Sequence, residues 1–151
     1  MEALYDSPEA FSASPGDEAM SDAAITERCV PDAPGLTIGA FQGTALVGMA
    51  DYVPDRGQKT RHKAKLVGVY LKPDWRKSGV GRAMVEAIIA HARQQRVILK
   101  CHATMHNLPA RRLYHALGFV QFGVERDALM IDGQGFDEEL LMLDCRQDPE
   151  V

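Results

Sequence analysis

Apolar and polar residues alternate in three segments of the first half of the chain, and this period-two pattern predicts β-strands. The segments are residues 36–41, 45–53 and 63–72. The dipeptide Gln42-Gly43 predicts a tight turn that joins the first two strands into a hairpin. Before them, residues 8–11 fit a single helical turn, and residues 17–28 fit a weakly amphipathic surface helix.

In the second half the period changes to that of helices. Five apolar residues share one face of a predicted helix over residues 81–95: Met84, Val85, Ile88, Ile89 and Ala92. A second helix is expected over residues 108–117. Asn107 is placed to cap its start, and Gly118 is placed to take the left-handed conformation after its end.

Further strands are expected over residues 97–103, 119–126 and 138–145, with a turn at residues 132–135 between the last two. The order of elements is then helix, three strands, helix, strand, helix and two strands. This order predicts a mixed α/β fold, in which helices flank a central mixed and twisted sheet.

Composition places the chain among ordinary globular domains. It has 151 residues, of which 46% are hydrophobic and 25% are charged. We expect one domain over residues 1–151, in which residues 1–16 form an N-terminal segment that is a candidate for flexibility. The net charge of −4 argues against a nucleic-acid partner, which requires a basic face. No apolar run approaches the ~20 residues of a membrane span, so no membrane partner is expected.

The cysteines and the N-terminus bear on location. Cys29, Cys101 and Cys145 are odd in number and far apart, which argues against a disulfide scaffold and against a zinc site. The N-terminus lacks the basic and apolar regions of a secretory signal. We therefore expect a cytoplasmic protein without a metal.

Residues 69–82 are the most informative segment, because a strand enters a loop with two glycines that opens into the clearest helix. Gly79 and Gly81 lack the Cβ atoms that keep an anion from the backbone, and amides at a helix start favour such an anion. Arg76 and Lys77 add positive charge. The loop indicates a pyrophosphate ligand, with a solvated glycine turn as an alternative of equal weight.

Two motifs together resemble those of the GCN5-related N-acetyltransferase (GNAT) superfamily. The sequence RKSGVG at residues 76–81 fits the pattern Arg/Gln-x-x-Gly-x-Gly/Ala of that family. The sequence NLPARRLYHALGF at residues 107–119 fits its pattern Asn-x-x-Ala-x-x-Leu-Tyr-x-x-Leu-Gly-Phe. The separation of the motifs and the order of the elements also match, and the resemblance covers residues 7–145.

The resemblance implies the GNAT fold and an N-acetyltransferase that uses acetyl-CoA as its co-substrate. It implies direct attack of a primary amine on the thioester in a ternary complex. The strand backbone would pair with the pantetheine arm, the loop amides would hold the pyrophosphate, and an asparagine would contact the arm. The residues implied are Val69, Tyr70 and Leu71 in the strand, Arg76, Lys77, Ser78, Gly79, Val80, Gly81 and Arg82 in the loop, and Asn107.

The same resemblance places Tyr114 near the thioester sulfur. A tyrosine with an ordinary pKa of about 10 is protonated at neutral pH, so Tyr114 is the candidate general acid for the leaving thiolate. Packing in the core is the alternative role of its ring. A backbone N–H near Val69 or Leu71 is the candidate oxyanion donor.

The base that accepts a proton from the amine is left open. The candidates are Asp51, Asp55, His62, His102 and Glu139. His102 is placed in the strand beside the expected cofactor cleft, although a packed or surface histidine is the favoured interpretation.

The chain departs from the family pattern at its start. Members usually begin with a strand and a helix before the segment that SPEAF at residues 7–11 resembles. Here that segment comes almost at once, so we expect the first strand to be missing and residues 1–5 to form the tail of the first helix. One sheet edge would then be open, and a homodimer is one way to cover it.

The acceptor is therefore limited only to a small-molecule or peptide amine. Two rival functions are retained. One is a CoA-binding regulatory or degenerate module without turnover. The other is a nucleotide-binding protein, which the absence of a third glycine at Met84 disfavours.

Overall fold

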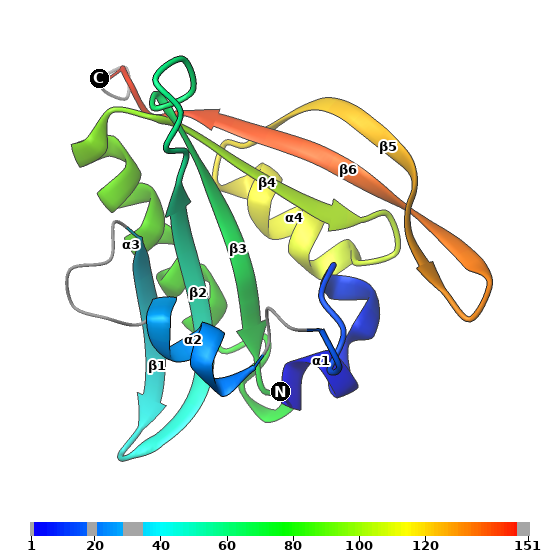
Figure 1. The fold of residues 1–151 in the computed structure, drawn as a ribbon. Coiled ribbons are helices and arrows are strands. Elements are labelled where there is room, and N and C mark those ends of the chain that lie inside the picture. The colour runs from blue at the N-terminus through cyan, green and yellow to red at the C-terminus, as the bar shows by residue number, and fades with distance from the viewer. Residues whose placement is uncertain (1, 18–20, 29–34, 148–151) are drawn as a thin grey trace.

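The computed structural model describes residues 2–17, 21–28 and 35–147 of the chain (Figure 1). Two short helices, α1 (Glu2–Asp6) and α2 (Asp22–Arg28), and the 3-10 turn η1 (Pro8–Ala10) precede the sheet. The longer helices are α3 (Val80–Gln95), which follows the 3-10 turn η3 (Pro73–Trp75), and α4 (Leu108–Ala116). The strands are β1 (Leu36–Gln42), β2 (Ala45–Pro54), β3 (Lys63–Leu71), β4 (Ile98–Thr104), β5 (Val120–Ile131) and β6 (Gln134–Asp144).

The six strands form one mixed sheet in the order β1-β2-β3-β4-β6-β5. Only the central pair, β3 and β4, is parallel, and the four other pairs are antiparallel. The parallel connection between β3 and β4 contains α3, as a right-handed crossover requires. The mixed sheet flanked by helices that the sequence predicts is confirmed.

The central pair separates along its length. β3 pairs with β4 only from Lys63 to Lys65 on one strand and from Ile98 to Lys100 on the other. Beyond those residues β3 keeps its pairing with β2, and β4 keeps its pairing with β6. The sheet therefore opens into a V between the ends of β3 and β4, which Figure 1 shows as two diverging arrows.

A β-bulge marks β3 where the V opens. Asp51 of β2 is opposite Val67, whereas Met49 is opposite Tyr70, so β3 carries one extra residue there. Gly68 takes a φ of +62°, the left-handed conformation typical of glycine in such a bulge. The bulge leaves a residue out of the ladder and turns the end of β3 away from regular pairing.

The core lies between the sheet and α3, with α4 beside it. Buried residues of α3 pack against buried residues of the central strands, among them Ala50, Leu66 and Leu99. In Figure 1, α3 and α4 lie behind the sheet and α2 lies in front of it. No helix in the described part of the chain is long and apolar enough to cross a membrane.

The N-terminal segment lies at the open end of the V. Leu4 of α1 is buried. Glu2 and Asp6 form ion pairs with Lys72 and Arg76, which follow β3, at 3.2 Å and 2.6 Å. η1 lies against β4. The segment thus runs from the end of β3 to β4, and α1 confirms that these first described residues are helical.

Several predicted boundaries shift. The first hairpin turns at Gly43-Thr44 rather than at Gln42-Gly43, because Gln42 still pairs with Ala45. The last hairpin turns at Asp132-Gly133 alone, so both of its strands are longer than predicted. The predicted helix over residues 17–28 begins at Asp22, and its residues 18–20 lie outside the described residues, as does Cys29.

Candidate active site

The loop between β3 and α3 has the conformation of an anion site. Lys77 and Gly79 take positive φ values of 62° and 88°. Alternation of left-handed and right-handed residues turns successive N–H groups toward one side of the backbone. In the part of the chain that the structure describes, the amides of Gly81 and Arg82 have no backbone acceptor, since the first helical bond runs from Ala83 to Gly79.

Arg76 and Val80 are less available to donate to an anion than the sequence suggests, because both already donate within the chain. The Arg76 N–H donates to the Pro73 carbonyl at 3.1 Å. Its guanidinium donates to the Leu71 carbonyl at 3.0 Å and to Asp6 at 2.6 Å, beside the Tyr70 ring. The Val80 N–H donates to the Ser78 hydroxyl at 3.4 Å. The remaining loop amides and the start of α3 are therefore the candidates for binding an anion. Arg76 connects the loop to the N-terminal segment through Asp6.

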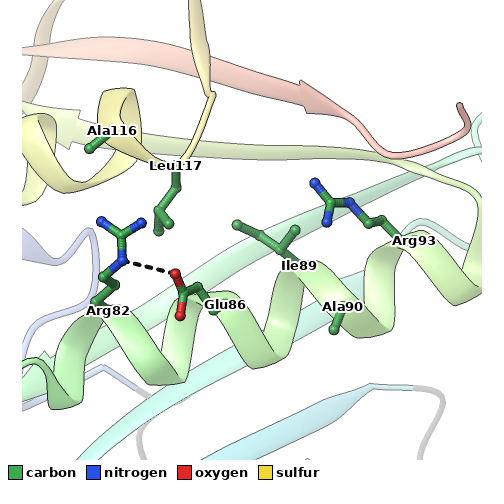
Figure 2. A pocket seen from close by; sticks show the side chains of 7 residues that line it. All are labelled: Arg82, Glu86, Ile89, Ala90, Arg93, Ala116 and Leu117. Atoms are coloured by element: carbon green, nitrogen blue, oxygen red, sulfur yellow. Dashed lines mark hydrogen bonds and ion pairs between the residues drawn. The ribbon is translucent and has the colours of Figure 1, made fainter. Parts of the chain in front are cut away.

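A groove of about 390 Å³ continues from the loop between α3 and α4. Figure 2 shows Arg82 and Arg93 at its two ends, with Glu86 and Ile89 between them on α3 and Leu117, directly after α4, opposite them. Arg82 donates to Glu86 at 2.8 Å across one helical turn. The groove therefore offers apolar surface between two guanidinium groups, next to the helix start.

Helix α4 supplies the far wall of the cleft. Its N-cap is Asn107, whose Oδ1 accepts from the Ala110 N–H at 3.3 Å, as the sequence predicts. The side-chain NH₂ of Asn107 remains a donor toward other groups. Tyr114 lies on the buried face of α4, 5% exposed, with its ring 5.6 Å from that of Phe119. Burial raises the pKa of Tyr114, so its hydroxyl stays a proton donor at neutral pH.

Cys101 lies on the same side of the sheet as Tyr114 and is buried. Burial raises the pKa of its thiol, with a further contribution from Glu139. A thiol held in this way is protonated and inert, because the thiolate is the reactive form. Cys101 is therefore a small core residue, as the sequence indicates.

A buried carboxylate fixes α4 to β6. Glu139 is 1% exposed and accepts from Arg111 Nε at 2.6 Å and pairs with His115 Nε2 at 2.8 Å. Burial raises the pKa of Glu139, but hydrogen bonds from Arg111 and then His115 outweigh it and hold the pKa below its ordinary value. A carboxylate engaged on both oxygens in the core is a structural anchor, so Glu139 is a poor candidate for the base.

The opposite face of β4 and β6 carries a second pair. Side chains alternate along a strand, so His102, Thr104 and Glu138 lie on the face away from Cys101 and Glu139. We call this side the outer face. His102 Nδ1 lies 2.7 Å from Glu138 Oε2, and the imidazole is 41% exposed whereas Glu138 is buried. The Thr104 hydroxyl is buried and has no hydrogen-bond partner among the described residues.

The other base candidates are distributed differently. Asp55 and His62 lie at the closed end of the V, where the Asp55 N–H bonds Lys63 and the Ile98 N–H bonds His62. Asp51 lies on β2 beside Gly68 and accepts from the Thr37 hydroxyl at 2.6 Å. Of the candidates, only His102 lies on β4 where that strand forms a wall of the V.

A second hollow, of about 430 Å³, lies between residues 4–15 and the β5–β6 hairpin. It is lined mainly by apolar residues, including Leu4, Phe11, Leu129 and Ile131, with Asp132 among its polar groups. Phe11 also packs against Tyr70 of β3 on the outer face, with ring centroids 6.4 Å apart. We call this space the outer hollow.

Sequence reasoning missed three residues of the site: Asp6, Thr104 and Glu138. The adjacent acids Glu138 and Glu139 carried a usable signal, because neighbours on a strand point to opposite faces and one of them must then face α4. The pairing of Asp6 with Arg76 carried no local signal. Among the described residues, no group of three His, Cys, Asp or Glu side chains is arranged to hold a metal.

A comparison with families of known proteins gave a match over most of the chain. The model of the Acetyltransferase (GNAT) family matches residues 1–119. A comparison with curated proteins gave no match.

Solved structures share the fold. A ribosomal-protein-alanine N-acetyltransferase from Brucella melitensis is 25% identical, with a TM-score of 0.66 over 72% of this chain and 67% of that chain. A putative acetyltransferase from Acinetobacter baylyi is 22% identical, with a TM-score of 0.78 over 95% and 81%. A putative acetyltransferase from Salmonella typhimurium, solved with its cofactor acetyl-CoA, is 19% identical, with a TM-score of 0.69 over 78% and 69%.

Proposed function

The chain belongs to the GNAT family of acetyltransferases, and we propose that it moves the acetyl group of acetyl-CoA to a primary amine by direct attack in a ternary complex. One observation carries this proposal. The V between β3 and β4 opens beside a glycine loop whose helix-start amides lack backbone acceptors. An extended arm between the strands, with its pyrophosphate on the loop, fits both features.

Each part of acetyl-CoA has a counterpart along this path. The free edge of β3 at Val69, Tyr70 and Leu71 offers backbone groups to the two amides of the pantetheine arm, as an added strand would. The amides from Lys77 to Arg82, apart from that of Val80, are our candidates to hold the pyrophosphate, and the positive φ values of Lys77 and Gly79 support this. The groove between α3 and α4 begins at Arg82, which is our candidate donor to the phosphate on the ribose because it lies next to the loop.

The chemistry assigns Tyr114 and the β3 bulge to different steps. Attack on the thioester places negative charge on its carbonyl oxygen, and an amide freed by the bulge near Val69 is our candidate donor to it. Tyr114 donates a proton to the departing thiolate. Its raised pKa keeps it protonated for that role and makes complete transfer to a thiolate more uphill.

The acceptor enters from the outer face in this proposal. The outer hollow lies between the N-terminal segment and the β5–β6 hairpin, and it presents both apolar side chains and polar groups, which suits an amine with apolar and polar parts. A small-molecule amine and the α-amine of a peptide both meet this description. The Brucella structure, a ribosomal-protein-alanine N-acetyltransferase, supports testing peptide α-amines first.

The deciding experiment measures CoA release from acetyl-CoA across a panel of alkyl amines, amino acids and short peptides. We expect wild-type turnover with at least one amine, and we expect Tyr114→Phe to lower kcat by about 10²-fold. Tyr52→Phe is the matched control, because Tyr52 is an equally buried core tyrosine that packs on His91 of α3.

The outcomes separate the alternatives. Full kcat in Tyr114→Phe at every pH would remove the acid assignment. Acetyl-CoA binding without transfer to any amine would favour the CoA-binding module over the enzyme. Stabilisation of the chain against heat by NAD rather than by acetyl-CoA would favour a nucleotide-binding protein.

A further inference from the structure

His102 and Glu138 form a pair that the proposed chemistry has not yet used. They lie on neighbouring strands, and Leu140 is directly opposite His102 while Thr104 is opposite Glu138, so the pair bridges one diagonal step of the ladder. His102 Nδ1 is 2.7 Å from the Glu138 carboxylate. That contact fixes the ring and leaves Nε2 as the nitrogen available to another partner.

The pair is placed beside the opening of the V. The last residue of β4 that pairs with β3 is Lys100, and His102 is the next residue on the same face. From Cys101 onward, β4 has no strand beside it on the β3 side among the described residues. His102 is therefore the first outer-face side chain on the wall of the V.

The outer face is also the side of the outer hollow. Glu138 lies two residues along β6 from Phe136, which is opposite Leu129 in the lining of that hollow. The imidazole is 41% exposed, so a ligand from solvent can reach it. Tyr114, by contrast, lies on α4 behind the sheet. The two groups thus approach the V from opposite sides.

We propose that His102, oriented by Glu138, is the base that accepts the proton of the acceptor amine. This proposal rests on the acetyltransferase function proposed above. Glu138 acts through His102 and is a positioning residue. The arrangement gives the two proton transfers of the reaction to opposite faces of the sheet, with the base on the acceptor side and Tyr114 on the other.

The proton and bond changes balance. The acceptor ammonium gives one proton to His102 Nε2, and the nitrogen lone pair then forms the N–C bond to the thioester carbonyl. The C–S bond breaks, and its electron pair stays on sulfur. Tyr114 protonates the thiolate, and the second proton of the nitrogen passes through water to restore the Tyr114 hydroxyl. The products are an amide, a free thiol and one proton, which His102 returns to solvent.

The charges around His102 set the pH range of this step. The Glu138 hydrogen bond raises the pKa of His102; burial lowers it, the charges of Glu138 and Glu125 raise it, and Lys65 lowers it. The balance lies above the ordinary value of 6.5. A base works in its neutral form, so kcat should rise with pH through a value above 6.5 and then level off.

The test compares the pH dependence of kcat in the wild type and its variants, with an alkyl amine whose pKa near 10 keeps its own ionisation apart. His102→Gln should lower the plateau of kcat by 10²-fold or more and remove the rise. Glu138→Gln should keep the rise but move it to lower pH, because the raising contact is lost. His62→Gln is the control, because His62 is exposed and lies at the closed end of the V. Asp51→Asn tests the remaining carboxylate on β2.

Acetyl-CoA affinity, measured by the shift in Tm, should stay the same in all of them. A small loss of kcat in His102→Gln, or a rise that remains in place, would overturn the assignment of the base. So would a loss of the rise in Asp51→Asn alone. If the wild type transfers acetyl to no amine while it binds acetyl-CoA, the proposed function fails, and the base with it. Transfer at close to the wild-type rate in His102→Gln removes the base alone.

Discussion

The backbone conformation of Gly79 shapes the loop that we propose as the anion site. Its φ of +88° is strained for a residue with a side chain, yet a Cβ there would meet no atom within 4 Å. The residue is needed for its conformation and for the space it leaves, since packing does not exclude a side chain. Lys77 nearby also takes a positive φ without being glycine, a cost that functional loops often carry.

Gly79 and Gly133 make a matched pair for testing the loop. Gly133, in the β5–β6 turn, has a φ of +77°, and a Cβ added there would also meet no atom within 4 Å. Alanine at either site should lower the free energy of unfolding by about 1 kcal/mol through backbone strain. Gly79→Asp should also weaken acetyl-CoA binding by 10-fold or more, because its charge repels the pyrophosphate. Gly133→Asp should leave the Kd unchanged, and isothermal titration of all four variants would reveal any other result.

At this scale the sequence predicts local motifs well and long-range pairs poorly. The loop glycines and the Asn107 cap follow from residues a few positions apart, and both have the expected conformations. For His102 the sequence favours a packed or surface role, because its partner Glu138 lies on another strand and only the register of β4 and β6 brings them together. The contact of Arg76 with Asp6 also lies beyond the reach of local patterns.

Helix α4 depends on one buried carboxylate for its position. Packing alone does not fix α4, because Tyr114 is its only fully buried residue. Glu139 of β6 holds two successive turns of α4 through Arg111 and His115. Arg111 also donates to the Met105 carbonyl at 3.1 Å, which links α4 to the turn before it. The wall of the cleft that carries Asn107 and Tyr114 is thus tied to the sheet.

Glu139→Gln should therefore lower the free energy of unfolding by about 1–3 kcal/mol at pH 7, the range for hydrogen bonds to charged groups. The pKa of Glu139 in the folded chain is below the unfolded value of about 4.5, so its stabilisation is present above that pH and declines as the pH falls through the folded pKa. Urea unfolding between pH 7 and pH 3 should show a shallower decline in the variant.

Glu86→Gln is the comparison for this measurement, because Glu86 forms an exposed pair with Arg82 on one helix. Its loss should cost no more than about 0.5 kcal/mol. Equal costs for the two substitutions would contradict the role of Glu139 as an anchor.

Elements with one buried face were predicted closely, and the exposed ribbon was not. α3 and α4 begin and end within one residue of the prediction, because their apolar faces and caps are local signals. β5 has mostly exposed residues with little alternation, so the sequence underestimates its length. Residues that pair only with a neighbouring strand and lack apolar side chains resemble a turn in sequence, as residues 134–135 do.

The V between β3 and β4 is the proposed binding place of acetyl-CoA, and it divides the sheet into two halves. Two halves of the sheet, β1-β2-β3 and β4-β6-β5, are joined by only three residue pairs at its closed end. α1 and η1 connect the two halves at the open end, through Arg76 on one side and β4 on the other. A ligand between the strands would add bonds to both halves.

Binding of acetyl-CoA should therefore protect amides in a defined place. We expect slower hydrogen exchange at residues 69–71 of β3 and at the start of α3 when acetyl-CoA is added. Exchange at residues 63–65 and 98–99 should slow less, because those residues already pair and gain only from the greater stability of the whole chain. At 100 times its Kd the ligand should stabilise the chain by about 2.7 kcal/mol. Uniform protection of the whole sheet would instead indicate only that global unfolding is suppressed.

The separation of β3 from β4 gives the sheet two strand edges in its interior, in addition to those at β1 and β5. Unpaired edges invite other chains to add as strands, which leads to aggregation. Here the exposed lengths are short, they diverge from a common apex, and the N-terminal segment spans their mouth. This geometry leaves room for the pantetheine arm but disfavours the addition of a strand from another chain. The sheet can therefore be open between β3 and β4 with little risk of aggregation through strand addition.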